Sequence, residues 1–354
     1  MHKTECKLIQ EHRQKNMKVL SELKKESKAE IVAAYELLAA ALMASSKNAE
    51  RLATLGVFDV LAAAASSHKQ DADVQERMVA GIFNMCASGC DDARRQLATD
   101  AGALETAADA LKSHPKEPRV AVNALKLLRK IADGVDEAGV EKRCARASAA
   151  GAIEASVDAM ASALVSFAPG AAPGISAESI AEEGCAVLCL LSFGLDEEEA
   201  AERSERAAKA GGIDAVIASM KAHVKNQEVQ AQACSALANL CGGFDEAARA
   251  RRRLARSLGA VDAIEAAGHA GGRAPMALDV LETEERVETS VQLGADGVTS
   301  ARAVAAEINS ESAEPDDDDE EKKKPEDDEE LGKARDRDEA PLKVGGRVEA
   351  ISLS

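Results

Sequence analysis

The stretch GGIDAVIASMKAHVKNQEVQAQACSALANLCGG, residues 211 to 243, contains two amphipathic segments between pairs of glycines. In the first segment, apolar residues at i, i+3, i+4 and i+7 form one face of a helix. They are Ile213, Val216, Ile217 and Met220. A short polar break precedes the second segment, whose apolar face comprises Val229, Ala233, Ala236, Leu237 and Leu240. Because each helix is apolar on one side only, this hairpin needs neighbours to cover it.

Two glycine markers recur along the chain at matching intervals. The first marker is the glycine that precedes an apolar helix, and it occurs at Gly56, Gly102, Gly151, Gly211 and Gly259. Successive copies are 46, 49, 60 and 48 residues apart. The second marker reads GCDD, GVDE, GLDE and GFDE, and these copies begin at Gly89, Gly134, Gly194 and Gly243. They are 45, 60 and 49 residues apart. At the second marker we expect a glycine stop, one packed apolar side chain, and an aspartate that caps the next helix. A period near 45 residues with three helices per unit predicts an all-α solenoid.

The repeated unit resembles the armadillo repeat. The segments that carry the resemblance are AGGIDAVIASMKAH, EVQAQACSALANLC and, at residues 74–86, VQERMVAGIFNMC. They are most similar to the armadillo segments of leucine-rich-repeat kinases and related armadillo-containing proteins. The resemblance covers roughly residues 30–290. It implies an armadillo-type α-solenoid, a superhelix of about five repeats.

The markers also predict the domain boundaries. Residues 1–46 are expected to form an N-terminal helical cap or partial repeat, 47–290 the repeats, and 291–354 a disordered acidic tail. The long third step falls in a loop rich in proline and glycine, at 165–178. The expected repeats are about 47–88, 91–133, 136–193, 196–242 and a degenerate 245–290.

Composition and charge exclude several classes of protein. Aromatic residues make up 2% of the chain, which suits closely packed helices better than a β-sheet. The net charge is −18, and residues 311–340 contribute −10 of it. We therefore expect no nucleic-acid binding, since phosphate binding needs clustered positive charge. With no apolar run of 18 residues and no signal sequence, we expect no membrane span and an intracellular, cytoplasmic protein, with a nuclear location also open.

The cysteine and histidine patterns are the features most suggestive of a metal or redox site. A purely structural role explains them better. Cysteines lie four or seven residues apart in the pairs Cys86 and Cys90, Cys185 and Cys189, and Cys234 and Cys241. Cysteine in the apolar positions of a repeat acts as a small hydrophobic residue. His68, His114 and His223 each follow a marker glycine by 12 residues, where histidine is favoured at a helix C-terminus. We expect no catalytic residue, no cofactor and no metal.

The armadillo resemblance implies a partner groove on the third helix of each repeat, where an asparagine bonds an extended peptide and a tryptophan stacks one turn earlier. Asn84 and Asn239 match the asparagine, whereas Lys130 and Leu190 replace it. The tryptophan positions hold Ala80, Lys126, Ala186 and Ser235. The missing tryptophans argue against recognition of basic peptides of the nuclear-import type. The candidate groove comprises Arg77, Asn84, Arg119, Asn123, Lys126, Lys130, Ser235 and Asn239.

These patterns predict a non-enzymatic scaffold that binds a protein or peptide along the groove. The basic groove residues of the first two repeats would attract an acidic partner segment, or the protein's own acidic tail. Two alternatives stay open. The repeats could be the regulatory or adaptor fragment of a larger kinase-like signalling protein, or the cysteine pairs could make a thiol- or metal-responsive protein.

Overall fold

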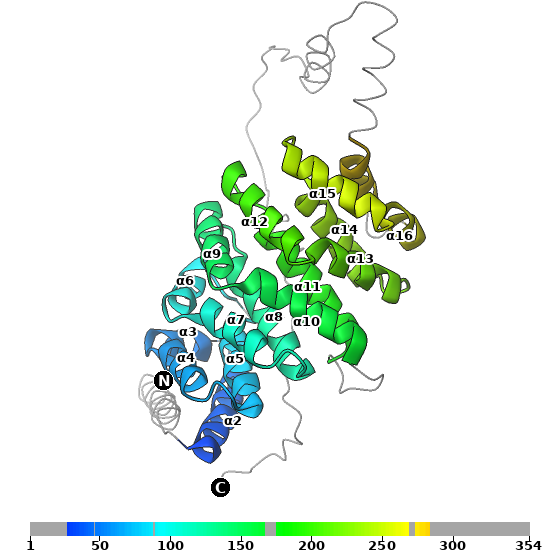
Figure 1. Ribbon diagram of the computed structural model, residues 1–354. Helices are drawn as coiled ribbons and strands as arrows, with labels where there is room; N and C mark the ends of the chain where they lie inside the picture. The colour runs from blue at the N-terminus through cyan, green and yellow to red at the C-terminus, as the bar shows by residue number, and fades with distance from the viewer. Residues whose placement is uncertain (1–26, 46, 88, 167–174, 269–272, 284–354) are drawn as a thin grey trace, which may run out of the picture.

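The computed structural model describes residues 27–45, 47–87, 89–166, 175–268 and 273–283. Within these ranges the regular secondary structure is entirely α-helical (Figure 1). The charged segment before residue 27 and the acidic tail at 291–354 lie outside the described residues, so the predictions made for them stay predictions.

The helices follow one another in groups of three. In each of the four complete groups the third helix has 15 or 16 residues. The four triplets are α3 (Lys47–Thr54), α4 (Val57–Ser67) and α5 (Ala72–Ala87); α6 (Asp92–Asp100), α7 (Ala103–Ser113) and α8 (Pro118–Ala132); α9 (Glu137–Ala149), α10 (Ala152–Ser166) and α11 (Ala177–Leu191); α12 (Glu197–Lys209), α13 (Gly212–Ala222) and α14 (Gln227–Cys241). They are preceded by α2 (Lys28–Ala44) and followed by α15 (Glu246–Ser257), α16 (Ala260–Ala267) and a helical segment at 273–283.

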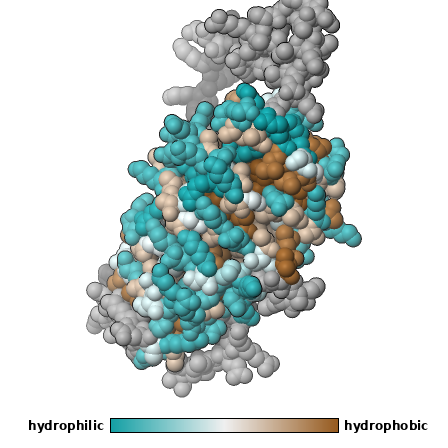
Figure 2. Space-filling model, in the orientation of Figure 1, coloured by the Kyte–Doolittle hydropathy of each residue, from teal (hydrophilic) through white to brown (hydrophobic). Residues whose placement is uncertain are grey.

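The triplets stack so that equivalent helices form columns (Figure 1). The third-helix column, which comprises α2, α5, α8, α11 and α14, is the most closely packed. In a curved stack the elements on the inside of the curve approach one another most closely, so this column lines the inner side. The predicted all-α solenoid of three-helix repeats is therefore confirmed. In the view of Figure 2, hydrophilic residues dominate the first repeats, and apolar residues become more frequent over the later ones.

The two glycine markers act in different ways. All five glycines of the first marker have a positive φ, for example 87° at Gly211, a conformation that glycine adopts without strain. In the second marker, Gly89 and Gly243 also have a positive φ, whereas Gly134 and Gly194 do not. A Cβ at Gly134 would instead lie 2.5 Å from the guanidinium of Arg143, and one at Gly194 would lie 2.5 Å from that of Arg203. These two glycines make room for side chains.

The predicted aspartate caps are present at three of the four turns between repeats. Asp91, Asp196 and Asp245 each accept a hydrogen bond from a backbone N–H in the first turn of the next helix. Asp136 stands at the same position, but its side chain makes no such bond. Pro118 occupies the first turn of α8, as its missing N–H allows.

The expectation of a packed apolar side chain at the second marker is wrong. Val135 is 92% exposed, Leu195 59% and Phe244 85%. The turns are held through their backbones instead, as described below, so the chain path directs these side chains outward.

The predicted loop at 165–178 is too long at both ends. Helix α10 continues to Ser166, and α11 already begins at Ala177. The Ser176 hydroxyl accepts a hydrogen bond from the Ser179 N–H at 3.1 Å, which caps α11 earlier than the composition suggested. Residues 167–174 lie outside the described part of the chain.

Buried arginines join each third helix to the first helix that follows it. We call Arg94, Arg143, Arg203 and Arg251 the arginine clamps; each is at most 8% exposed. Each clamp donates hydrogen bonds to backbone carbonyls at the end of the preceding third helix or in the turn after it. The Arg203 Nε donates to the Leu191 carbonyl at 2.7 Å. The clamps thus satisfy carbonyls that a helix end leaves without partners.

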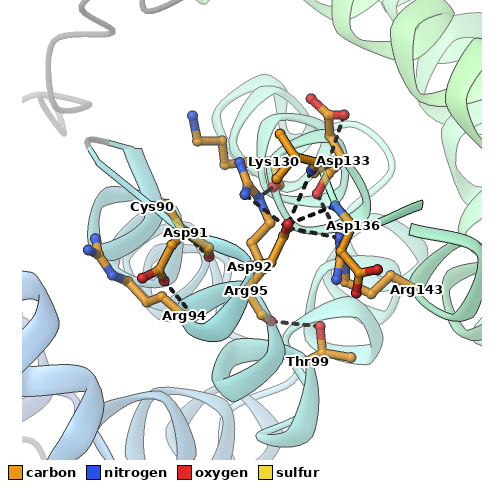
Figure 3. Close-up of polar contacts among 12 residues, drawn as sticks. Cys90, Asp91, Asp92, Arg94, Arg95, Thr99, Lys130, Asp133, Asp136 and Arg143 are labelled. Atoms are coloured by element: carbon orange, nitrogen blue, oxygen red, sulfur yellow. Dashed lines mark hydrogen bonds and ion pairs between the residues drawn. The ribbon is translucent and has the colours of Figure 1, made fainter. Parts of the chain in front are cut away.

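An acid from the preceding repeat completes three of these joints. The ion pairs are Asp92 with Arg143 at 3.3 Å, Glu141 with Arg203 at 2.7 Å, and Glu205 with Arg251 at 3.2 Å. The Asp92 Oδ2 also accepts the backbone N–H groups of Val135 and Asp136 (Figure 3). Likewise, the Glu141 Oε2 accepts the Leu195 N–H at 2.8 Å. One acid therefore holds both the arginine and the turn of the next repeat.

Loss of a clamp should destabilise the stack strongly. We expect Arg203→Ala to lower the free energy of unfolding by about 3–5 kcal/mol, because it removes a buried guanidinium and leaves the partly buried Glu141 carboxylate and two carbonyls without their partner. Lys209→Ala on the same helix is the matched control. Its ammonium is 73% exposed in a surface ion pair with Glu205, so the expected loss is below about 1 kcal/mol. Equal losses in urea titrations followed by circular dichroism would contradict a structural role for the clamp.

Candidate functional site

The structure places all eight predicted groove residues on the third-helix column. Six lie on the adjacent helices α5 and α8, which pack directly against each other. The other two, Ser235 and Asn239, lie on α14, with α11 between α8 and α14. The structure therefore brings together the basic residues of the first two repeats and separates them from the pair on α14.

Two arginines of the predicted groove already have acidic partners. The Arg119 Nη1 lies 3.5 Å from the Glu76 Oε1, and Arg77 pairs with Asp73 at 3.9 Å on its own helix. Burial raises the pKa of the Glu76 carboxyl, although the charges of Arg119 and Arg77 oppose that shift. These two arginines are therefore held in ion pairs and supply little unpaired positive charge to the groove.

A further cross-helix ion pair escaped the sequence interpretation. The Arg129 Nη1 of α8 lies 2.9 Å from the Glu183 Oε2 of α11. Both carboxylates are buried: Glu76 is 5% exposed and Glu183 6%. Their position in the sequence is a usable signal for such pairs. Each glutamate lies one to two turns after the start of its third helix, on the apolar side of that helix. The two pairs link α8 to both of its neighbours.

Lys126 and Lys130 supply the available positive charge on this face. They are one turn apart on α8 and both partly exposed. Within the described residues, neither ammonium group has an ion-pair partner. Two cations held on a helix between fixed neighbours attract carboxylates and other anions.

The asparagines are largely used inside the stack. The Asn239 Nδ2 donates to the Cys189 carbonyl of α11 at 2.9 Å, so its amide ties α14 to α11. Asn84 is 8% exposed and Asn123 3%. The Ser235 hydroxyl donates to the Ala231 carbonyl of its own helix at 3.2 Å. A peptide in this groove would therefore meet lysines more readily than a ladder of free amides.

The cysteines differ sharply in acidity. Burial raises the pKa of Cys144 and Cys241 to about 12 and that of Cys189 to about 11. Cys90, next to the N-terminus of α6, is partly exposed. A hydrogen bond with the Cys86 thiol lowers the pKa of Cys90 to about 7. The charges of nearby basic residues act in the same direction; these residues are Arg95, Arg94 and Lys130.

The three histidines each follow the last residue of a second helix, at the ends of α4, α7 and α13. The His114 Nε2 lies 2.8 Å from the Lys69 carbonyl of the preceding repeat, so this imidazole bridges two repeats. Across the described part of the chain, no three His, Cys, Asp or Glu side chains come together as a metal would require. In the same residues, every helix is too short or too polar to cross a membrane.

Comparison with known proteins identifies no family for this chain. No protein-family model matches the sequence, and no curated protein matches it. One solved structure with some likeness comes from work on a conserved phosphorylation switch that controls the interaction between cadherin and beta-catenin. The match has 12% identity and a TM-score of 0.42, and it covers 74% of this chain. This chain spans about half of that chain's length, 51%.

The bond between Asn239 and Cys189 should contribute to stability. We expect Asn239→Ala to lower the free energy of unfolding by about 1 kcal/mol, because the Cys189 carbonyl loses its donor. Ser235→Ala, one turn earlier, should cost less, since its hydroxyl bonds only within its own helix. Equal stabilities of Asn239→Ala and wild type in urea titrations would show that the inter-helix bond is not needed.

Among the cysteines that the structure describes, Cys90 should be the thiol that reacts first with an alkylating agent. With its pKa lowered to about 7, the thiolate fraction and the rate should rise between about pH 6 and pH 8 and then level off. Cys189 is also partly exposed but has a pKa raised to about 11, so it should react far more slowly. Mass spectrometry of iodoacetamide adducts over this pH range measures both rates. Equal rates at pH 7 would contradict the assigned environments.

Proposed function

We propose that this chain is a non-enzymatic scaffold that binds an acidic segment of a partner protein on its third-helix column, centred on α8. The observation that carries the proposal is the pair Lys126 and Lys130. These ammonium groups lie on a helix fixed between its neighbours and, within the described residues, have no ion-pair partner.

The surrounding ion pairs support a preformed site. Arg119 and Arg129 connect α8 to buried carboxylates on both sides, at 3.5 Å and 2.9 Å. A surface that is already rigid loses little conformational entropy when a partner binds. The carboxylates of Glu76 and Glu183 balance these two arginines, so the net attraction rests on the two lysines.

The protein's own acidic segment is a competitor of the same chemistry. Residues 311–340 carry 16 acidic and 6 basic residues, a net charge of −10. A segment tethered to the repeats acts at a high effective concentration, so it would weaken binding of an acidic partner. We therefore include self-occupation in the proposed function, as a form of autoinhibition.

Charge reversal of the lysines tests the proposal. In full-length protein at low salt, Lys126→Glu with Lys130→Glu should weaken binding of a fluorescent peptide of about ten alternating Asp and Glu residues by about tenfold or more. Fluorescence anisotropy measures the affinity. The difference should shrink at high salt, because screening weakens exposed charge pairs.

The matched control is Lys209→Glu with Lys225→Glu, which changes the net charge by the same amount at exposed positions of the fourth repeat. An equal loss of affinity in this control would assign binding to overall charge and refute the site. Deletion of residues 311–340 should tighten binding to the wild-type lysines. No change on deletion would refute autoinhibition while leaving the partner site intact.

A further inference from the structure

The turns between repeats present large apolar side chains to solvent at equivalent positions. We call Val135, Leu195 and Phe244, together with Phe193, the turn row. Phe193 and Leu195 are each 59% exposed, and the other two are more exposed still. Single exposed apolar residues are common on proteins, but three successive repeats carry one at the same point of the unit. The recurrence follows the edge where each third helix meets the next first helix.

The turn row is held in a fixed conformation. The N–H groups of Val135 and Leu195 donate to Asp92 and Glu141 of the preceding repeats, at 3.2 Å and 2.8 Å. The carbonyl of Phe193 accepts from the Arg203 clamp at 3.2 Å, and that of Phe244 accepts from Arg249 at 3.1 Å. Because the backbone is fixed, these side chains cannot turn inward to reduce their exposure.

Acidic residues flank every member of the turn row. Each first helix begins with exposed acids beside the apolar residue, and these are Asp136 and Glu137, Glu197 and Glu198, and Asp245 and Glu246. The clamps are balanced by acids of the preceding repeats. At the last turn Glu246 is paired with Arg249 at 3.2 Å and Arg253 at 2.7 Å. Within the described residues, Glu137, Glu197 and Glu198 have no ion-pair partner. At the turns of Val135 and Leu195 the edge is therefore both apolar and negative, opposite in sign to the lysine site on α8.

A pocket lies between two members of the row. It has a volume of about 690 Å³, and Phe193 and Phe244 both line it. Its wall also includes Glu197, Glu198 and Ala201. The pocket thus combines aromatic side chains with carboxylates at its rim, which suits an apolar side chain that stands next to a basic one.

We propose that the turn row binds a partner segment in which large apolar side chains alternate with lysine or arginine. Apolar side chains of such a segment would cover the row and enter the pocket, which removes apolar area from water. Its basic side chains would pair with the flanking acids, which also steer its approach. The acids disfavour an anionic lipid surface or a nucleic acid at this edge. The site is separate from the lysine site, so it goes beyond the proposed function.

The row has a defined start. At the first turn between repeats the equivalent residue is Cys90, which is only partly exposed and lies beside Arg94 and Arg95. Positive charge there opposes a basic segment. The contact zone therefore extends from the turn at 133–137 to the pocket that Phe193 and Phe244 line.

Two peptides and two variants test the inference. The first probe is a fluorescent amphipathic peptide of about 18 residues made only of Leu and Lys, and the second replaces every Leu with Ser. Full-length wild type should bind the Leu peptide at least about tenfold more tightly than the Ser peptide. The triple variant Val135→Ser, Leu195→Ser, Phe244→Ser should lose this preference. All three sites are exposed, so the variant should keep wild-type circular dichroism.

The control variant changes three other exposed apolar residues: Val165→Ser, Leu254→Ser and Met276→Ser. It should keep the preference for the Leu peptide, as should Lys126→Glu with Lys130→Glu, which separates this site from the proposed function. Equal binding of the two peptides to wild type would overturn the inference, as would an equal loss in the control. Self-association of wild type that the triple Ser variant abolishes, seen by analytical ultracentrifugation, would assign the row to a second copy and also overturn it.

Discussion

The fold depends on how the carbonyl groups at the end of each third helix find hydrogen-bond donors where one repeat passes into the next. A third helix ends with carbonyls that lack intrahelical donors, and the next repeat covers them. The clamp guanidinium donates to these carbonyls and is neutralised by an acid of the preceding repeat, such as Glu141 beside Arg203. Each of these contacts between repeats therefore includes an acid from one repeat, an arginine from the next, and the turn that connects them. Packing of the apolar faces provides the larger area, whereas the joints set how one repeat is oriented on the next.

Much of the architecture follows from local signals, and the exceptions depend on contacts between repeats. Apolar periodicity and the first glycine marker predict the helices because both act within one repeat. The clamps were not predicted, since an arginine such as Arg203 has the spacing of a surface residue until the next turn is placed beside it. The outward direction of Val135 was mispredicted for the same reason. Likewise, sequence position indicates that Asn239 faces the groove, but only the packing shows that Cys189 takes its amide hydrogen.

The stack separates charge by surface. The third-helix column carries Lys126 and Lys130, and the edge formed by the turns carries acids around exposed apolar residues. Arginine, in contrast, is used mostly for internal joints, because its planar group can satisfy several carbonyls and a carboxylate together. A chain with a large negative charge can in this way present a local positive site and a distinct negative one. The two surfaces would suit segments of opposite charge, from one binding partner or from two.

The second glycine marker has a meaning that its spacing does not reveal. At Gly134 and Gly194 a methyl group would collide with the very ion pair that joins the repeats, at 2.5 Å from the clamp guanidinium in both cases. The glycine, the arginine and the acid thus constrain one another although they lie in two different repeats. During divergence of the repeats they would be expected to persist or disappear as a set. In this chain, therefore, a glycine that seems only to end a helix is required by the side chain of a neighbouring repeat.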